Sequence, residues 1–179
     1  AESEARGWDS GSQEKAMDNE GIDMAVMFPS RGLFSLGSDE IEPDLATAIC
    51  RAYNDWLADF CSGSNRMFGA GMIPPHDVEG AVQEARRAVN ELGFKTVFIR
   101  PNPVHGRNWH DTYYDPLWAE IQRLNVPLSF HEGGLVDLPQ PGDNFDTHML
   151  YHTCTHSMSM MLAAVDMAGG GVLERFPNL

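Results

Sequence analysis

The chain has 179 residues, of which 42% are hydrophobic, which suits one domain spanning 1–179 with a real core and excludes a disordered polypeptide. Its 26 acidic and 12 basic residues give a formal net charge of −14, which opposes binding to nucleic acid or to an anionic membrane surface. The sequence has no run of 18 apolar residues, so no membrane-spanning segment is expected.

The cysteines and the N-terminal segment bear on the cellular compartment. Cys50, Cys61 and Cys154 are few, odd in number and without C-x-x-C spacing, which argues against a disulfide framework or a cysteine-zinc site. The first two fall in a helical pattern and are expected to be core thiols. Residues 1–12 lack the basic-then-apolar order of a signal peptide, so we expect a cytoplasmic protein.

The N-terminal part is predicted to alternate between helix and strand. Residues 13–19 are predicted to form a short helix, and the apolar run 22–28 is predicted to be the first strand. Pro29 ends this strand because proline cannot donate a hydrogen bond to a sheet. A polar loop is predicted over 31–42. Apolar side chains then recur at helical spacing over 45–60, which predicts an amphipathic helix of about four turns.

The middle of the chain repeats this alternation. The run 68–73 is predicted to be the second strand, and Asp77 is predicted to cap a helix over 78–92. Gly93 suits the position after that helix, where a left-handed backbone costs glycine little. The run 94–99 is rich in aromatic and β-branched residues, which predicts the third strand.

The last part contains one more strand between two helices. Pro116 suits the first turn of a helix over 115–124, and 126–130 is predicted to be the fourth strand. A polar loop over 133–146 is followed by a methionine-rich helix over 147–167. Its methionines are expected to fill the core rather than to hold a cofactor: Met158, Met160, Met161 and Met167.

Four strands that alternate with helices predict an α/β fold with a parallel sheet, in which chemistry is found at the carboxyl ends of the strands. The chain is shorter than the roughly 250 residues of a closed (β/α)8 barrel, so we expect it to form only part of such a barrel. It contains no G-x-G-x-x-G, no phosphate-binding P-loop and no G-x-S-x-G, which disfavours nucleotide binding and serine-hydrolase chemistry.

His131 follows the fourth predicted strand, so it is the best candidate for chemistry. It can face the open end of the sheet and bind a divalent metal through a neutral ring nitrogen, or it can be hydrogen-bonded within a loop. Glu132 would point the opposite way, which favours a supporting or surface role. His152 and His156 lie on one helical face with a spacing that could share a metal, but fortuitous spacing is the favoured interpretation.

Arg100 ends the third predicted strand at the same edge of the sheet as His131. It could hold a substrate carboxylate in a bidentate fashion, or it could pair with an acidic residue of a loop. Several other residues lie in or beside loops that follow strands, where they could shape a pocket or lie on the surface: His76, His105, Trp109, His110 and Asp111.

Six segments in this order resemble the amidohydrolase-related (amidohydrolase 2) family, which includes the aminocarboxymuconate-semialdehyde decarboxylase-like enzymes. They are GIDMAVMFP (21–29), MIP (72–74), GFKTVFIRPN (93–102), YDPLW (114–118), VPLSFHEG (126–133) and GGVLERFPNL (170–179). The resemblance implies a distorted (β/α)8 TIM-type barrel, present here as about strands 2 to 5 with flanking helices. It also implies that His131 matches a metal-binding histidine.

The resemblance implies a metal-dependent hydrolase or a non-oxidative decarboxylase that acts on a small carboxylated substrate. The expected metal is zinc, with manganese as the alternative, and the expected assembly is a homodimer. Arg100 and His156 would be substrate contacts. The family's H-x-H-like motif of the first strand is missing before Gly21, and its eighth-strand aspartate would lie beyond Leu179. A truncated or degenerate barrel with a binding or assembly role is therefore the alternative to an enzyme.

Overall fold

The computed structural model describes residues 9–30, 32–132 and 139–179. Its elements follow in chain order: α2 Ser10–Glu20, β1 Ala25–Met27, the 3-10 helix η1 Gly32–Leu36, α3 Pro43–Ser62, β2 Met67–Met72, α4 Val78–Asn90, β3 Thr96–Ile99, the 3-10 helix η2 Thr112–Tyr114, α5 Asp115–Leu124, β4 Leu128–Phe130, α6 His148–Gly169 and α7 Val172–Arg175.

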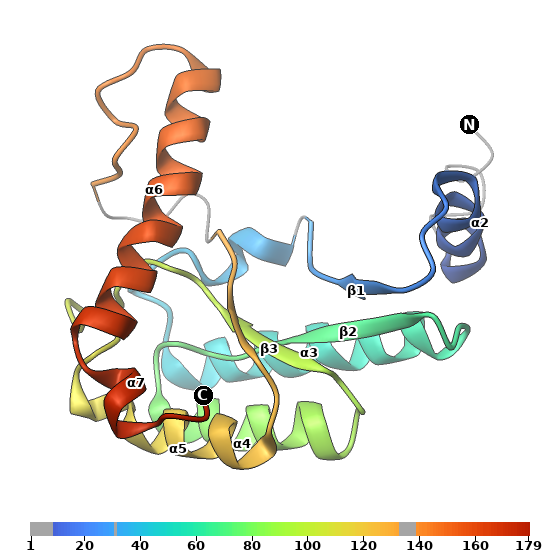
Figure 1. The fold of residues 1–179 in the computed structure, drawn as a ribbon, viewed down its shortest axis with the longest axis horizontal. Coiled ribbons are helices and arrows are strands. Elements are labelled where there is room, and N and C mark those ends of the chain that lie inside the picture. Colours follow the sequence, from blue (N-terminus) through green and yellow to red (C-terminus); the bar gives the residue numbers. More distant parts are fainter. Residues whose placement is uncertain (1–8, 31, 133–138) are drawn as a thin grey trace.

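The four strands form one parallel sheet in the order β1-β2-β3-β4, which confirms the predicted α/β alternation. Helices α3, α4 and α5 lie along one side of the sheet, while α2 and α6 stand apart at its two ends (Figure 1). All four strands lie within the predicted apolar runs or within one residue of them, although β1 and β4 are only three residues long. The carboxyl ends of the strands therefore share one edge.

Small residues in β2 let the neighbouring layer approach closely. A β-carbon at Gly69 would overlap the ring of Phe94, and one at Gly71 would lie 2.8 Å from the β-carbon of Ala88 on α4. Glycine at these positions therefore makes room for the aromatic ring and the helix, at the cost of a weaker intrinsic preference for strand. The buried pattern of β2 follows from this close packing.

The helix ends carry the signals expected from the sequence. The carboxylate of Asp77 accepts a hydrogen bond from the backbone N–H of Gly80 at 2.6 Å, which caps α4. Pro116 lies in the first turn of α5, and Asn125 ends that helix in a left-handed conformation with φ of 55°. In α3, Cys50 and Cys61 are buried, as predicted.

The core between the sheet and the helices is strongly aromatic at its α5 end. The ring of Trp109 lies 4.9 Å from that of Tyr114 and 6.3 Å from that of Trp118, measured between centroids. Each indole N–H is satisfied by a backbone carbonyl: Trp109 donates to Pro101 at 2.8 Å and Trp118 donates to Trp109 at 3.1 Å. This cluster packs the loop after β3 against α5.

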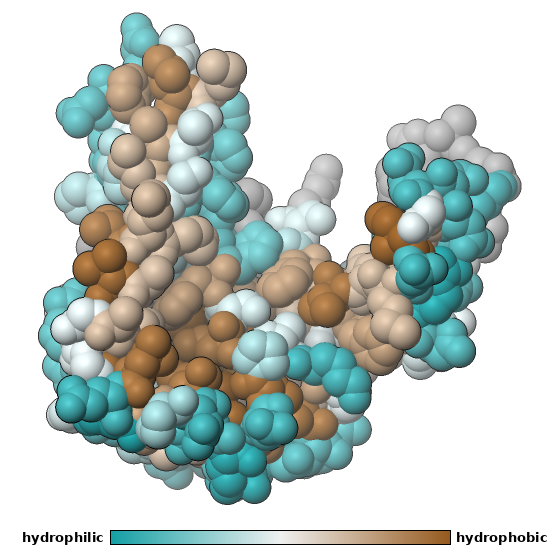
Figure 2. All heavy atoms as spheres, viewed as in Figure 1, coloured by the Kyte–Doolittle hydropathy of each residue, from teal (hydrophilic) through white to brown (hydrophobic). Residues whose placement is uncertain are grey.

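The expectation that the methionines of α6 are core residues is only partly correct. Met167 is buried, whereas the side chains of Met158 and Met161 are 47% and 67% exposed. Apolar side chains also lie along α6 and over the adjacent sheet in the view of Figure 2. Periodicity identified the helix, but it could not show that one face of α6 is left without a packing partner among the described residues. Within those residues, no helix is long and apolar enough to cross a membrane.

A buried amide joins α3, β2 and α4. The side chain of Asn54 accepts a hydrogen bond from the backbone N–H of Met72 and donates to its carbonyl, both at 2.9 Å. It also donates to the carboxylate of Glu84 at 2.7 Å, and this carboxylate accepts two further bonds from Arg87. Because Asn54 and Glu84 are almost fully buried, water cannot replace these bonds.

We predict that Asn54→Ala lowers the free energy of unfolding by about 2–4 kcal/mol, because it removes both Asn54 hydrogen bonds of the buried Met72 backbone and one of the three hydrogen bonds that the buried Glu84 carboxylate accepts. Urea denaturation at pH 7 measures the loss, and Asn90→Ala, at an exposed position of α4, is the matched control. A loss below about 0.5 kcal/mol, the usual range for a surface substitution, would show that the network is not required.

A second ion-pair cluster links α4 and α5. Both carboxylate oxygens of Glu120 accept hydrogen bonds from Arg123 and from Arg86, with distances between 2.6 and 3.2 Å. These bonds outweigh the effect of burial and lower the pKa of Glu120 to about 2. The carboxyl of the unfolded chain titrates near its ordinary value, so the folded state gains stability above that value.

We therefore predict that Glu120→Gln destabilises the protein by roughly 1–3 kcal/mol at pH 7. The difference between wild type and variant should be constant above about pH 5 and shrink as the pH falls toward 2, because the wild-type carboxylate is protonated in that window. Unfolding curves recorded across pH 2.5 to 7 measure it. A difference that does not change over this range would contradict the role of Glu120.

Candidate functional site

His131 lies where the sequence predicts it, at the carboxyl end of β4. The pairing of Ile99 with Phe130 places β3 and β4 in register, and the backbone N–H of His131 continues the ladder by donating to Ile99 at 2.9 Å. Arg100, the residue after β3, therefore lies beside His131 at the same end of the sheet. Both residues line a small pocket with Met72 of β2.

The ring of His131 lies against an apolar wall formed by two phenylalanine rings. Its centroid is 5.2 Å from that of Phe28 and 5.9 Å from that of Phe98. Its Nδ1 lies 3.4 Å from the carbonyl oxygen of Glu132, and its Nε2 has no hydrogen-bond partner in the part of the chain that the structure describes. A neutral imidazole held in this way can offer one lone pair to a metal.

Glu132 does not lie alone on the surface. Its Oε2 is 2.6 Å from Nδ1 of His156, and its Oε1 is 3.5 Å from Nδ1 of His152. The two histidine rings lie 5.5 Å apart on successive turns of α6. One ligand atom from each of the three residues lies within 4.8 Å of the others, which makes this group a candidate metal centre. The sequence showed the histidine pair but not the carboxylate that faces it.

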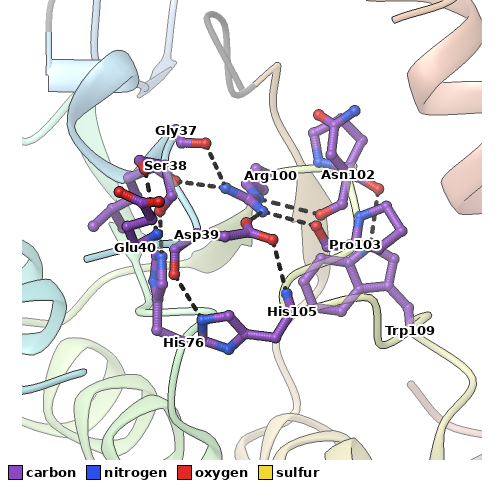
Figure 3. A network of polar contacts seen from close by, with 12 residues as sticks. Gly37, Ser38, Asp39, Glu40, His76, Arg100, Asn102, Pro103, His105 and Trp109 are labelled. Carbon is purple, nitrogen blue, oxygen red and sulfur yellow. Dashed lines mark hydrogen bonds and ion pairs between the residues drawn. The ribbon is translucent and has the colours of Figure 1, made fainter. Parts of the chain in front are cut away.

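Arg100 is buried and its hydrogen-bonding capacity is fully used. All five N–H groups of the guanidinium donate to protein acceptors, which come from the loop after β1 and from the segment after β3. The acceptors are the carbonyl oxygens of Leu36, Gly37, Asn102 and Pro103 and the carboxylate of Asp39 (Figure 3). This geometry corresponds to the alternative of a pair with a loop acid, and it leaves no donor for a substrate carboxylate.

Two histidines complete this network. His105 donates its backbone N–H to the carboxylate of Asp39 at 2.9 Å, and its Nε2 lies 2.7 Å from the carbonyl of the same residue. Burial alone would raise the pKa of Asp39, but the hydrogen bonds from Arg100 and His105 lower it below its ordinary value. Nε2 of His76 lies 2.8 Å from the carbonyl of Ser38, and burial lowers the pKa of this histidine. Both histidines hold the loop after β1.

The other loop residues considered from the sequence also have structural partners. The backbone N–H of Trp109 donates to Asp166 of α6 at 2.6 Å, and the ring of His110 contacts the same carboxylate. Asp111 caps η2 through the N–H of Tyr113 at 2.8 Å. The contacts of Trp109 and His110 tie the loop after β3 to α6, and the Asp111 cap is local to η2, so these residues shape the fold around the pocket rather than its chemistry.

Comparisons with known proteins agree on one family. A family model described as Amidohydrolase (Amidohydro_2) matches residues 2–179. Gamma-resorcylate decarboxylase of Rhizobium radiobacter is 29% identical over 177 residues, which cover 92% of this chain and 51% of that enzyme. The 2-amino-3-carboxymuconate-6-semialdehyde decarboxylase of Dictyostelium discoideum is 28% identical, with coverages of 96% and 46%. The chain spans about half the length of the curated relatives it matches.

Solved structures show the same likeness in three dimensions. A 5-carboxyvanillate decarboxylase of Novosphingobium aromaticivorans, complexed with manganese and 4-hydroxy-3-methoxy-5-nitrobenzoic acid, is 26% identical with a TM-score of 0.73. The alignment covers 96% of this chain and 48% of that one. The 2,6-dihydroxybenzoate decarboxylase of Rhizobium is 24% identical with a TM-score of 0.76, and the alignment covers 93% and 53% of the two chains. The four strands are thus part of a TIM-type barrel fold, as predicted.

We predict that Arg100→Met lowers the free energy of unfolding by about 3–5 kcal/mol, because it strands a carboxylate and several carbonyl groups in a buried site. Urea denaturation measures the loss. Arg107→Met is the matched control, since that exposed guanidinium only covers the ring of Tyr113 and its loss should cost about 1 kcal/mol or less. A variant as stable as wild type but with a raised KM for an acid would instead support the substrate contact predicted from the sequence.

Proposed function

The chain belongs to the amidohydrolase family, and on that premise we propose that it is part of a metal-dependent enzyme that removes carbon dioxide from a small carboxylated aromatic acid. The relatives and solved structures named above are decarboxylases by name, and one of them was solved with manganese and a nitrobenzoic acid. Decarboxylation is therefore favoured over hydrolysis of a C–N or C–O bond. The comparisons do not favour a non-catalytic barrel.

The observation that carries this proposal is the Nε2 of His131 at the carboxyl end of β4, which has no hydrogen-bond partner within residues 9–30, 32–132 and 139–179. Barrel enzymes place their chemistry at this end of the strands, and an imidazole there is a suitable ligand for a divalent transition metal. The residue also opens into a pocket whose other walls include Phe98 and Ile99. We assign the metal contact to His131, as the resemblance implied.

The donor set in this chain fits the expected metal in part. His131 offers one ligand nitrogen, while the other family ligands expected from the resemblance have no counterpart in the sequence. A divalent cation, manganese or zinc, would withdraw charge from the substrate carboxylate and its neighbouring oxygen when bound. The protein's own contribution is to keep water away from the ligand: Phe28 and Phe98 cover one side of the His131 ring.

Arg100 contributes to the pocket by holding its wall in place. Arg100 fixes the loops after β1 and β3 through its backbone acceptors, so the wall of the pocket is rigid before a substrate binds. His156, the other predicted substrate contact, has its Nδ1 engaged by Glu132, which leaves Nε2 as the nitrogen for any contact with substrate. A homodimer and a cytoplasmic location stay predictions from the sequence.

The proposal predicts that His131→Ala lowers metal affinity and decarboxylase activity by at least roughly 100-fold, since loss of even an indirect partner of a metal ligand costs 10–100-fold. Elemental analysis of purified protein and release of carbon dioxide from 2,6-dihydroxybenzoate measure the two effects. His148→Ala, at an exposed position of α6, is the control and should leave both unchanged.

Two results would contradict the proposal. Full metal content and full activity in His131→Ala would exclude this residue as a ligand. Release of ammonia from 2,6-dihydroxybenzamide, without release of carbon dioxide from the acid, would replace decarboxylation by hydrolysis while keeping the metal site.

A further inference from the structure

Three side chains from two separate segments converge beside α6, and none of them is needed for the proposed role of His131. Glu132 follows β4 by two residues, while His152 and His156 come from the N-terminal half of α6. We propose that these three residues form a distinct transition-metal site that fastens α6 to the end of β4. This inference does not rest on the decarboxylase proposal.

The ligand set selects the class of metal. Two imidazole nitrogens and one carboxylate oxygen are the protein ligands of several zinc sites, where a water takes the fourth position. Calcium and magnesium prefer sites made of oxygen ligands, so they are disfavoured here. The site is therefore expected to take zinc, and cobalt as its spectroscopic substitute.

Two of the three distances between ligand atoms require only small side-chain movements, and the third is at most 4.8 Å. Ligand atoms of a tetrahedral zinc at 2.0–2.1 Å lie about 3.3 Å from one another. The 3.5 Å between Glu132 and His152 already matches this spacing, and the 2.6 Å between Glu132 and His156 has to open by a fraction of an ångström. The hydrogen bond in that pair is replaced by two metal bonds when the cation enters.

The backbones that carry the ligands are anchored on both sides. His131, next to Glu132, is bound to β3 through its backbone N–H. On α6, the buried hydroxyl of Thr155 accepts a hydrogen bond from the N–H of Gly142 at 3.2 Å, and a β-carbon at Gly142 would overlap the carbonyl of Tyr151. The loop around Gly142 is therefore seated on the helical turn that precedes His156. Anchored ligands lose less freedom when a metal binds.

The chain supplies two histidines that serve as controls. His148 continues the row on α6, and its ring stacks on that of His152 with centroids 5.8 Å apart, but it is outside the group of three. His131 is adjacent to Glu132 in sequence and is also outside the group.

The simplest rival is a carboxylate that accepts hydrogen bonds from two histidines without any metal. The histidines are half-exposed, so a cation can enter from solvent.

The test is a zinc titration in the His131→Ala background, which removes the metal contact of the proposed active site. Competition with a chromophoric chelator gives stoichiometry and affinity, and circular dichroism confirms the fold of each variant. We expect one zinc per chain. Adding His152→Ala, His156→Ala or Glu132→Gln should weaken binding by at least roughly 10-fold, whereas adding His148→Ala should change it less than 2-fold.

Two further readouts separate a built site from loose surface binding. Cobalt bound to His131→Ala should give the visible absorption of a four-coordinate ion with nitrogen and oxygen ligands, and this absorption should vanish in His131→Ala with Glu132→Gln. Zinc should raise the melting temperature of His131→Ala but not that of His131→Ala with His156→Ala, because only the folded state brings the two segments together.

The inference is overturned if His131→Ala binds no zinc, or if it binds zinc equally well after each of the three substitutions. Loss of binding in His148→Ala alone would move the site along the helix and would also refute it. None of these outcomes depends on carbon dioxide release, so failure of this site and failure of the proposed function are distinguishable.

Discussion

One buried guanidinium determines the arrangement of the loops around the pocket. Arg100 donates all five of its N–H groups, and its acceptors lie on two loops that are more than 60 residues apart in sequence. A buried charge is tolerated only when each of its hydrogen-bonding groups is satisfied, so neither loop can move without leaving that charge exposed to an apolar interior. Asp39 and His105 extend the same constraint outward. The pocket wall is a consequence of these bonds.

The position of His131 follows from the sheet rather than from the loops. Parallel pairing of β3 with β4 fixes its backbone, and the aromatic rings of Phe28 and Phe98 fix the plane of its imidazole. The pocket thus combines a strand end, which is rigid because of its ladder, with loops made rigid by Arg100. Preorganisation of this kind suits the proposed function, in which the site would hold a cation and a small acid in a defined geometry.

Local sequence patterns were sufficient to predict the helices and strands but not the contacts that their side chains make in the candidate site. The signals for these elements depend on neighbours in sequence, and the structure confirms each of them: the cap at Asp77, the proline at position 116 in the first turn of α5 and the four apolar runs. The saturation of Arg100 depends on carbonyl groups of a distant loop, which carry no side-chain signal. The carboxylate facing His156 lies 24 residues before it, across a long loop, so helical spacing alone could not reveal it. Contacts made by backbone groups or across long loops are therefore the ones that could not be predicted from the sequence.

The closed network around Arg100 also affects how an anion would approach. Its charge is compensated by Asp39 and by carbonyl dipoles, so it adds little to the outward field of a chain whose formal net charge is −14. An aromatic carboxylate diffusing toward this surface meets long-range repulsion, and short-range attraction has to come from a bound cation. Added salt shortens the Debye length to about 10 Å at 0.1 M and weakens the repulsion. Under the proposed function, the association rate of an aromatic acid with this chain should then rise with ionic strength, which is the reverse of electrostatic steering.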